Sequence, residues 1–319
     1  MKVSAVIATA FRDRELRNAL RALGAQSRRP DEVVVVDGAP PPGVEALVAQ
    51  LASETGLPMS YRRVTPPSAA VQRNVGAAHA AGDVLLFLDD DAYAAADCVE
   101  KMLRVLEEDS EGKIGGVGVL ISNQPNPPPS RRAKRWFDFL AGERRSSYSG
   151  AVIGPAINIG PEPTPDGRIV EVEWLNTGCT AYRRAAFDPE RFCPAFYGYS
   201  YMEDVDLSVR IARRWRLVVH TGASIFHDTS PSRFKAPFTR GRMSVSNRYY
   251  VMTNSLGKRS AGMHAKFVVF HAVNWASRLP RARSLRQASE LIAEGAGLAV
   301  GMFQVAATAL GSVARGAPR

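Results

Sequence analysis

The chain has 319 residues, 45% of them hydrophobic and 23% charged, which is the composition of a globular protein with one large or two modest domains. Its three cysteines lie far apart without a CxxC pair, so neither a disulfide framework nor a cysteine zinc site is expected. The apolar run at the N-terminus is too short for a signal peptide, and we expect a cytoplasmic protein.

Apolar runs rich in β-branched residues alternate with helical patterns over residues 1–121. Expected strands cover 3–9, 32–38, 59–64, 83–90 and 114–121, and expected helices cover 13–26, 43–55, 68–82 and 94–108. This alternation predicts an α/β fold with a mostly parallel, Rossmann-like sheet flanked by helices. Ligands bind outside the carboxyl ends of such strands, so Thr9, Asp37 and the acids from Asp89 to Asp91 are expected to converge.

The pattern changes after residue 121. A proline-rich loop leads to a short basic helix near residues 130–140, and residues 172–184 have strand-like character. Residues 201–214 form an amphipathic helical pattern, and 216–228 predict two short strands or one bent strand. We therefore divide the chain into a domain over 1–228, with halves 1–121 and 122–228, and a mostly helical extension over 229–319.

Three aspartates, Asp89, Asp90 and Asp91, directly follow a buried strand. One aspartate would serve as the N-cap of the next helix, but three adjacent carboxylates repel one another. A divalent cation such as Mn²⁺ or Mg²⁺ removes this repulsion, and it commonly binds through one or two carboxylates together with substrate phosphates. The triplet therefore predicts a metal site that takes a phosphate-bearing ligand.

Other polar residues have both a structural and a functional interpretation. Asp37 precedes Gly38, so it either forms a turn or recognises a base or ribose. Arg73 is either an exposed helix charge or a ligand for a nucleotide. Glu203 and Asp204 open a helix, where the macrodipole favours acids, but a carboxylate beside the aromatic run before them could also act as a general base.

The chain resembles the family 2 glycosyltransferases, which have the GT-A fold. The matching segments, in the same order and spacing over residues 1–228, are "VSAVIATAFRDRELRNALRALGAQSRRPDEVVVVDGA", "AAVQRNVGAAHAAGDVLLFLDDDA", "WLNTGCTAYRRAAF" and "YMEDVDLSVRIARR". One departure is that "VVDGAP" supplies a single carboxylate where the family commonly has Asp-Asp-Gly-Ser or Asp-Asn-Ala-Ser.

The resemblance implies an inverting transfer of a sugar from a nucleotide diphosphate donor, a UDP- or dTDP-sugar, to a hydroxyl of a glycan or lipid-linked acceptor. Residues 1–121 would bind the nucleotide sugar and 122–228 the acceptor. The implied donor-binding residues are Thr9, Asp37, Arg73, Asp89 and Asp90.

In the same resemblance, Asp91 is the direct ligand of Mn²⁺ or Mg²⁺, with Asp89 beside it, and Asp204 is the catalytic base. Trp174, in "WLNTGC", would offer a flat apolar face to the acceptor sugar, and Glu203 would also contact the acceptor. His227 follows a strand and would join the metal site, although a surface or structural histidine is the alternative.

Three other functions are alternatives to glycosyl transfer. A nucleotidyltransferase on a similar sheet would need a glycine-rich phosphate loop after the first strand, which "IATAFRDRE" lacks. A non-catalytic nucleotide-sugar or carbohydrate-binding protein would not need Asp89, Asp91 and Asp204 together. A dehalogenase-type phosphatase is disfavoured because its acids follow the first strand.

The net charge of +10 is concentrated in one segment. Residues 229–289 contain twelve Lys or Arg residues and no Asp or Glu. A solvated basic surface would explain this, and the segment has no nucleic-acid-binding motif, so we expect no nucleic-acid partner. We favour contact with the anionic inner face of the membrane or with a lipid-linked diphosphate. Residues 297–314 are apolar but rich in Gly and Ala, which favours a packing or interfacial helix over a spanning one.

Overall fold

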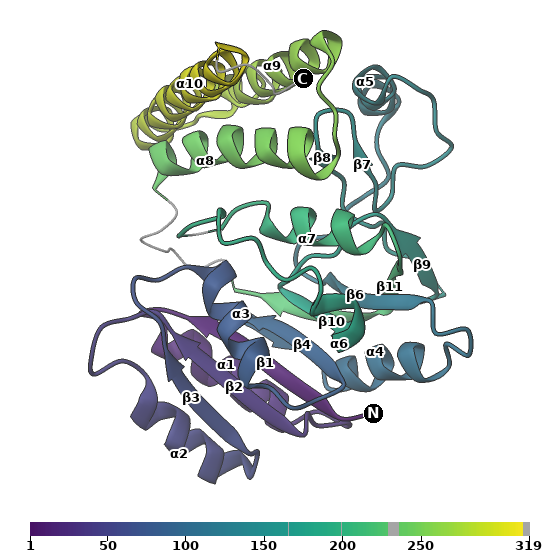
Figure 1. Ribbon diagram of the computed structural model, residues 1–319, viewed down its shortest axis with the longest axis vertical. Helices are drawn as coiled ribbons and strands as arrows, with labels where there is room; N and C mark the ends of the chain where they lie inside the picture. Colours follow the sequence, from purple (N-terminus) through teal and green to yellow (C-terminus); the bar gives the residue numbers. More distant parts are fainter. Residues whose placement is uncertain (165, 199, 229–235, 315–319) are drawn as a thin grey trace. The chain divides into compact units, whose positions relative to one another are not determined.

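The computed structural model describes residues 1–164, 166–198, 200–228 and 236–314, with the backbone alone at 308–314 (Figure 1). The chain divides into two compact units. The first comprises Met1–Pro128, Tyr148–Ala151 and Asn158–Ser230, and the second comprises Pro129–Ser147, Val152–Ile157 and Pro231–Arg319. Residues 129–147 thus group with the C-terminal helices, whereas the sequence analysis placed them in the domain over 1–228.

The first unit is built on a nine-stranded sheet that is mostly parallel, as predicted (Figure 1). Four parallel strands form one half, in the order β3 (Met59–Arg63), β2 (Glu32–Asp37), β1 (Val3–Thr9) and β4 (Val84–Asp89). The sheet continues with β10 (Cys179–Arg183), β6 (Ile114–Ile121) and β11 (Arg216–His227). Two short strands, β9 (Ile169–Val172) and β5 (Ala92–Ala94), pair with the beginning and the end of β11.

Three strands run antiparallel to their neighbours, and of these only β10 lies within a stretch, 172–184, that was expected to have strand-like character. The three strands are β10, inserted between β4 and β6, and the short strands β5 and β9. Strand β5 ends at Ala94, the first residue of the helix expected over 94–108, and that helix begins only at Cys98. Residues 216–227 form one strand, with a register shift between His220 and Ser224.

Helices cover both faces of this sheet. Helices α1 (Asp13–Gly24), α2 (Glu45–Thr55) and α4 (Cys98–Glu107) bury their apolar residues with Ala5 and Ile7 of β1 in one core. Helix α3 (Ala69–His79) packs on the other face, where Gly76 lies so close to Val6 that a Cβ atom would come within 2.3 Å of its Cγ1. The same face holds the packed rings of Phe87, Tyr182, Phe187 and Phe192, which the short helix α6 (Arg184–Phe187) and the loop before α7 (Glu203–Ile211) help to supply.

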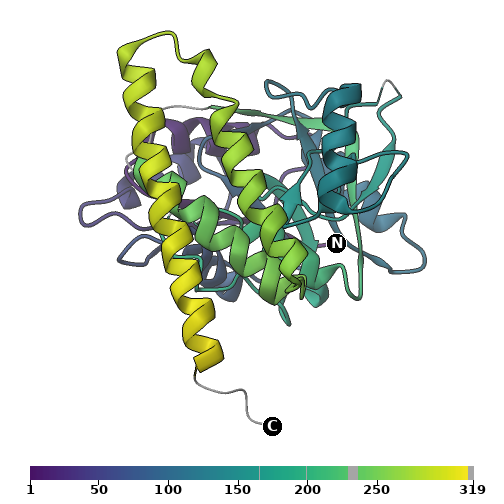
Figure 2. The ribbon, with the colours of Figure 1, turned by 90° about the horizontal axis from the view of Figure 1, so that it is seen from above.

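The second unit is mostly helical (Figure 2). It contains α5 (Arg131–Ala141), α8 (Pro237–Tyr250), α9 (Ala261–Ala276) and α10 (Leu285–Ala314), and the chain also forms the small hairpin of β7 (Val152–Ile153) and β8 (Ile157–Asn158). A π-helical turn (Val251–Ser255) follows α8, and a 3₁₀ turn (Leu279–Arg281) lies between α9 and α10.

Helix α10 contains the stretch Leu285–Ala307, which by length and composition alone could cross a membrane. Of the basic segment 229–289 that the sequence analysis singled out, residues 229–235 lie outside the described residues.

Candidate active site

The carboxyl ends of the parallel strands place the predicted polar residues along one edge of the sheet. Thr9, Asp37, Asp89 and His227 are the last residues of β1, β2, β4 and β11. Strand β10 runs the other way, so the loop before it lies at the same edge, and the carbonyl of Gly178 accepts a hydrogen bond from the Asp89 backbone N–H at 3.2 Å. Residues far apart in sequence therefore form one site.

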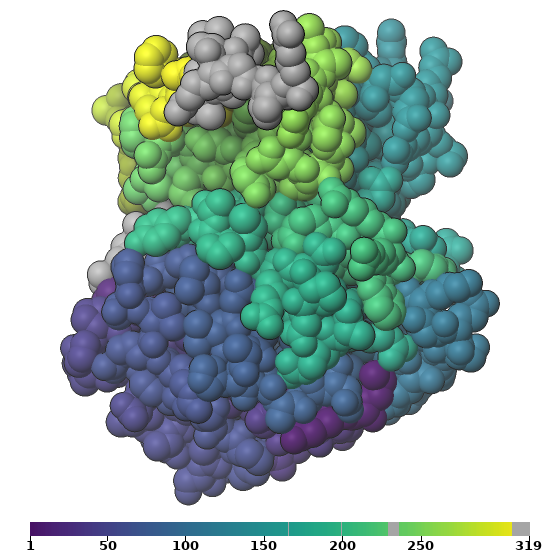
Figure 3. Space-filling view, in the orientation of Figure 1, coloured from purple at the N-terminus to yellow at the C-terminus, as the bar shows by residue number. Residues whose placement is uncertain are grey.

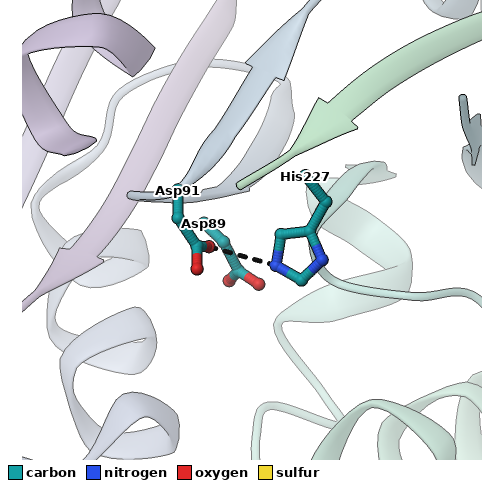
Figure 4. Close-up of side chains that lie close together, drawn as sticks. All are labelled: Asp89, Asp91 and His227. Carbon is teal, nitrogen blue, oxygen red and sulfur yellow. Dashed lines mark hydrogen bonds and ion pairs between the residues drawn. The ribbon is translucent and has the colours of Figure 1, made fainter. Parts of the chain in front are cut away.

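Asp89, Asp91 and His227 form a cluster at this edge. One ligand atom from each lies within 4.8 Å of those of the other two. Figure 4 shows the three side chains pointing toward one another, with His227 Nε2 lying 3.2 Å from Asp91 Oδ1. Two carboxylates and an imidazole are a donor set that suits Mn²⁺ or Mg²⁺ completed by phosphate oxygens or water. These three residues could therefore hold such an ion.

Asp90 is not one of the three residues of this cluster and has other partners. It accepts hydrogen bonds from Thr9 Oγ1 at 2.7 Å and from Arg12 Nη1 at 2.9 Å. Burial raises the pKa of Asp90 to about 7, against the opposing effect of the Arg12 charge. Asp90 and Asp91 lie in the turn between β4 and β5, and a single nitrogen atom, Arg12 Nη1, contacts both carboxylates. Asp90 thus links Thr9, at the end of β1, to the turn that follows β4.

Arg12 is a member of the site that the sequence analysis missed. Its Nη1 atom lies 2.6 Å from Asp91 Oδ2 as well as 2.9 Å from Asp90 Oδ1. Burial would raise the pKa of Asp91, but hydrogen bonds and charges from His227 and Arg12 outweigh it and lower that pKa. Arg12 follows the end of β1 across a turn in which Phe11 has a φ of 62°. Thr9 was selected because it ends a parallel strand, and Arg12 lies only three residues beyond it.

Arg73 is buried and joins two carboxylates. Its Nη2 atom donates to Asp89 Oδ1 and its Nη1 atom to Glu203 Oε1, both at 2.7 Å. The guanidinium also lies over the ring of Phe192, 5.4 Å from its centroid. The interpretation of Arg73 as an exposed helix charge is wrong. Glu203, expected to contact the acceptor, is instead buried, with its Oε1 paired to Arg73, since a buried carboxylate needs such a partner.

Asp204 lies at the first turn of α7, next to Glu203. Its Oδ1 atom accepts a hydrogen bond from the Val205 backbone N–H at 2.8 Å. Burial raises the pKa of Asp204 to about 6; that hydrogen bond and the charge of Arg73 lower the pKa, and the charge of Asp89 raises it further. The charges of Asp204 and Asp89 therefore interact, and the pKa of Asp204 is suited to a base that works near neutral pH.

Asp37 is fully buried and already hydrogen-bonded by its own loop. It accepts from the backbone N–H groups of Ala39 and Val44, at 2.8 and 3.0 Å, and from the Tyr61 hydroxyl at 3.1 Å. These bonds fold residues 38–44 against the end of β2, as an aspartate that caps a turn does. The structure thus shows the turn-forming role that the sequence left open.

Trp174 does not present the open ring that the sequence analysis expected. The side chain is 7% exposed, and its indole N–H donates to the carbonyl of Ile159 at 2.8 Å. A tryptophan buried with its N–H satisfied is a packing residue, because its apolar surface is already covered. This expectation is therefore corrected: Trp174 can shape the neighbouring loop but offers no exposed face to a sugar.

His227 is held in place by two residues of the loop after β6. Asn123 exchanges two hydrogen bonds with the His227 backbone, at 2.8 and 3.0 Å. The Gln124 side chain lies 3.2 Å from His227 Nδ1. A second partner on the far ring nitrogen is the usual way in which a metal-binding histidine is oriented. Asn123 and Gln124 directly follow a strand that ends at this edge, and the sequence analysis did not select them.

Comparison with known proteins agrees with this architecture. Residues 4–161 match the family described as glycosyl transferase family 2. A search of curated proteins found no significant match.

Solved structures with a similar fold include the mannosyltransferase PcManGT from Pyrobaculum calidifontis in complex with GDP-Man and Mn²⁺, with a TM-score of 0.56 and 19% identity over 94% of this chain and 80% of that one. S. aureus TarS 1-349 matches with a TM-score of 0.53 and 16% identity over 92% of this chain and 78% of that one. GalNAc-T7 with UDP, GalNAc and Mn²⁺ matches with a TM-score of 0.52 and 14% identity over 85% of this chain and 55% of that one.

These structural likenesses concern the fold, while the family match covers the strands and helices that carry Thr9, Asp37, Arg73, Asp89 and Asp91. The chain therefore contains a glycosyl transferase family 2 domain and is a glycosyltransferase of that family with the GT-A fold.

Proposed function

We propose that this glycosyltransferase moves a sugar from a UDP- or dTDP-sugar to a hydroxyl of a glycan or lipid-linked acceptor, with inversion at the anomeric carbon. The observation that carries the proposal is the cluster of Asp89, Asp91 and His227, with the charge of Asp89 interacting with that of Asp204. Relatives of similar fold have been solved with UDP, UDP-GlcNAc or GDP-Man, which supports a nucleotide-sugar donor.

The cluster would hold Mn²⁺ or Mg²⁺, which when bound stabilises the charge of a departing nucleoside diphosphate. Arg12 donates to Asp91 Oδ2 and Arg73 donates to Asp89 Oδ1, so each arginine fixes the direction of one carboxylate of the cluster. Asp204 takes the proton of the acceptor hydroxyl as that oxygen attacks the anomeric carbon. With a pKa of about 6, Asp204 is mostly deprotonated at pH 7 and can still accept a proton.

Two variants separate binding from chemistry. By calorimetry with UDP and Mn²⁺, Asp91→Asn should lose metal-dependent UDP binding, whereas Asp204→Asn should bind as the wild type does. Release of UDP from the best-binding nucleotide sugar, measured with a cell-envelope extract as acceptor, should stop in Asp204→Asn. Undiminished turnover by this variant would refute Asp204 as the base.

The alternative functions give different results in the same assays. A non-catalytic sugar-binding protein would bind a nucleotide sugar with Mn²⁺ and release no UDP with any acceptor. A nucleotidyltransferase would release pyrophosphate from a nucleoside triphosphate and a sugar phosphate. The proposed function predicts neither outcome.

A further inference from the structure

Helices α9 and α10 of the second unit expose an apolar surface, which we name the α9–α10 face. Atoms of α8, α9 and α10, coloured green to yellow, lie at the surface of this unit in Figure 3. Large apolar side chains are exposed on both helices, and the face consists of Val268, Val269, Val273, Leu285, Ile292 and Phe303. Three of them, Leu285, Ile292 and Phe303, are between 67% and 92% exposed, so the face has real apolar area to bury.

The two sides of α10 differ. One side packs tightly on α8, since Gly297 and Gly301 lie against the backbone of α8: added Cβ atoms would come within 2.0 Å of the Phe238 oxygen and 2.9 Å of the Arg242 oxygen. The opposite side carries Leu285, Ile292 and Phe303, spaced so that they share a stripe. A surface helix with one packed side and one apolar exposed side has the pattern of an interfacial helix.

Helix α9 repeats this arrangement. Its Phe267 and His271 are buried, and Phe267 packs against Tyr249 at the end of α8, with ring centroids 5.6 Å apart. Its exposed side carries Val268, Val269 and Val273, and no charged residue occurs between Lys266 and Arg278. The Trp275 indole N–H donates to the Leu291 carbonyl at 2.9 Å, which joins the end of α9 to the start of α10.

The charges around the α9–α10 face have one sign. Arg281 and Arg283 are exposed in the connection between the helices. The only acids over residues 236–314 are Glu290, which pairs with Arg286, and Glu294, which is buried between Arg240 and Arg278. The face therefore combines exposed apolar residues with uncompensated positive charge.

We propose that the α9–α10 face docks on an anionic lipid bilayer, with its apolar residues at the level of the acyl chains and Arg281 and Arg283 among the head groups. A basic rim complements anionic lipid, each arginine near such a surface strengthening binding about fivefold. A second copy of the chain is a poorer partner, because a symmetric contact would bring these arginines near one another. The α9–α10 face would lie at the boundary between the lipid head groups and the acyl chains. Helix α10 would not span the bilayer, because its other side is packed on α8 and buries the ion pairs of Glu294.

Sedimentation of the full chain with vesicles tests this proposal separately from glycosyl transfer. The wild type should bind vesicles with about 30% phosphatidylglycerol at least tenfold more tightly than pure phosphatidylcholine vesicles. The double variant Arg281→Glu/Arg283→Glu should weaken binding about 30-fold or more. Ile292→Glu/Phe303→Glu should weaken it at least tenfold, and the remaining binding should vanish at high salt.

Matched variants in the first unit control for charge and for an exposed apolar residue. Arg213→Glu/Arg214→Glu and Ile169→Glu should bind vesicles within twofold of the wild type, and all variants should bind UDP with Mn²⁺ unchanged. Equal binding to neutral vesicles, or wild-type binding by both α9–α10 variants, would overturn the proposal. So would a lipid-free dimer that Ile292→Glu/Phe303→Glu dissociates, because the partner would then be a second copy.

Discussion

Arg73 Nη2 lies 2.7 Å from Asp89 Oδ1, and the opposite end of the same guanidinium holds Glu203, so one buried cation ties the end of β4 to the first turn of α7. Removing one partner of a buried ion pair leaves an uncompensated charge. Arg73→Met should therefore lower the free energy of unfolding by about 3–5 kcal/mol, measured by urea denaturation.

An exposed ion pair provides the control for this variant. Arg104 pairs with Glu100 on α4 and its side chain is 62% exposed, so Arg104→Met should cost about 1 kcal/mol or less. Equal losses of unfolding free energy in the two variants would show that the ion pairs of Arg73 stabilise the chain no more than an exposed pair does.

Transfer should depend on pH through Asp204. Its pKa is raised to about 6 by burial, and only the deprotonated form accepts a proton from the acceptor hydroxyl. We expect kcat/KM to be level above pH 7 and to fall about tenfold per pH unit below about 5.5. The measurement is an initial-rate profile with Mn²⁺ kept saturating at each pH. A profile still level at pH 5 would exclude a base with this pKa.

Because its pKa is raised, the charged form of Asp204 lowers the stability of the folded chain at neutral pH. A carboxyl whose pKa is higher in the folded chain binds protons more tightly there, so the stability it contributes is lost as the pH rises from about 4 through about 6. At pH 7 Asp204→Asn should therefore raise Tm, even though it stops transfer. On the same helix, Asp206 is buried and pairs with Arg210 at 2.7 Å, so Asp206→Asn should lower Tm. If both variants lower Tm, then the environment of Asp204 favours its charged form.

Arg12 should compete with the metal for Asp91. Its positive charge lies 2.6 Å from one oxygen of that carboxylate and disfavours a second cation nearby. Without nucleotide, Arg12→Met should bind Mn²⁺ on the order of tenfold more tightly, measured by calorimetry. Arg14→Met is the control, since Arg14 is 71% exposed and should leave affinity unchanged. Weaker Mn²⁺ binding in Arg12→Met would mean that Arg12 chiefly orients the carboxylates.

The glycines of α10 should be essential to its packing on α8. An alanine Cβ at Gly297 would lie 2.0 Å from the Phe238 carbonyl oxygen, so Gly297→Ala must push the helices apart and should lower Tm by several degrees. At Gly262, on α9, a Cβ would meet nothing within 4 Å, and Gly262→Ala should be neutral or stabilise by up to about 1 kcal/mol. Thermal unfolding of the two variants measures the contrast, and equal Tm values would contradict this packing.

Much of the sheet could be predicted because parallel strands buried on both faces read as continuous apolar runs, as "EVVVVD" and "VLLFLD" do. The same reasoning placed Asp89 and Asp91 at a shared edge. Strands β5 and β9 are three and four residues long and lie at the margin of the sheet, so periodicity had too few residues to detect them.

The partners of the site residues were harder to predict than their positions. Whether Trp174 is open or buried depends on residues that fold over it, and no local pattern encodes that. The pairing of Arg73 with Glu203 joins positions 130 residues apart, which a single sequence does not reveal. Conversely, Arg12 lies three residues beyond the end of β1, so a rule that considers only the last residue of each strand does not select it.

The last strand to be synthesised, β11, supplies His227 to a cluster whose other members come from the end of β4. A nascent chain that has not yet produced residue 227 has only the two carboxylates of this cluster. Tight divalent-metal binding should therefore appear late in synthesis and would report that the sheet is complete from β1 to β11.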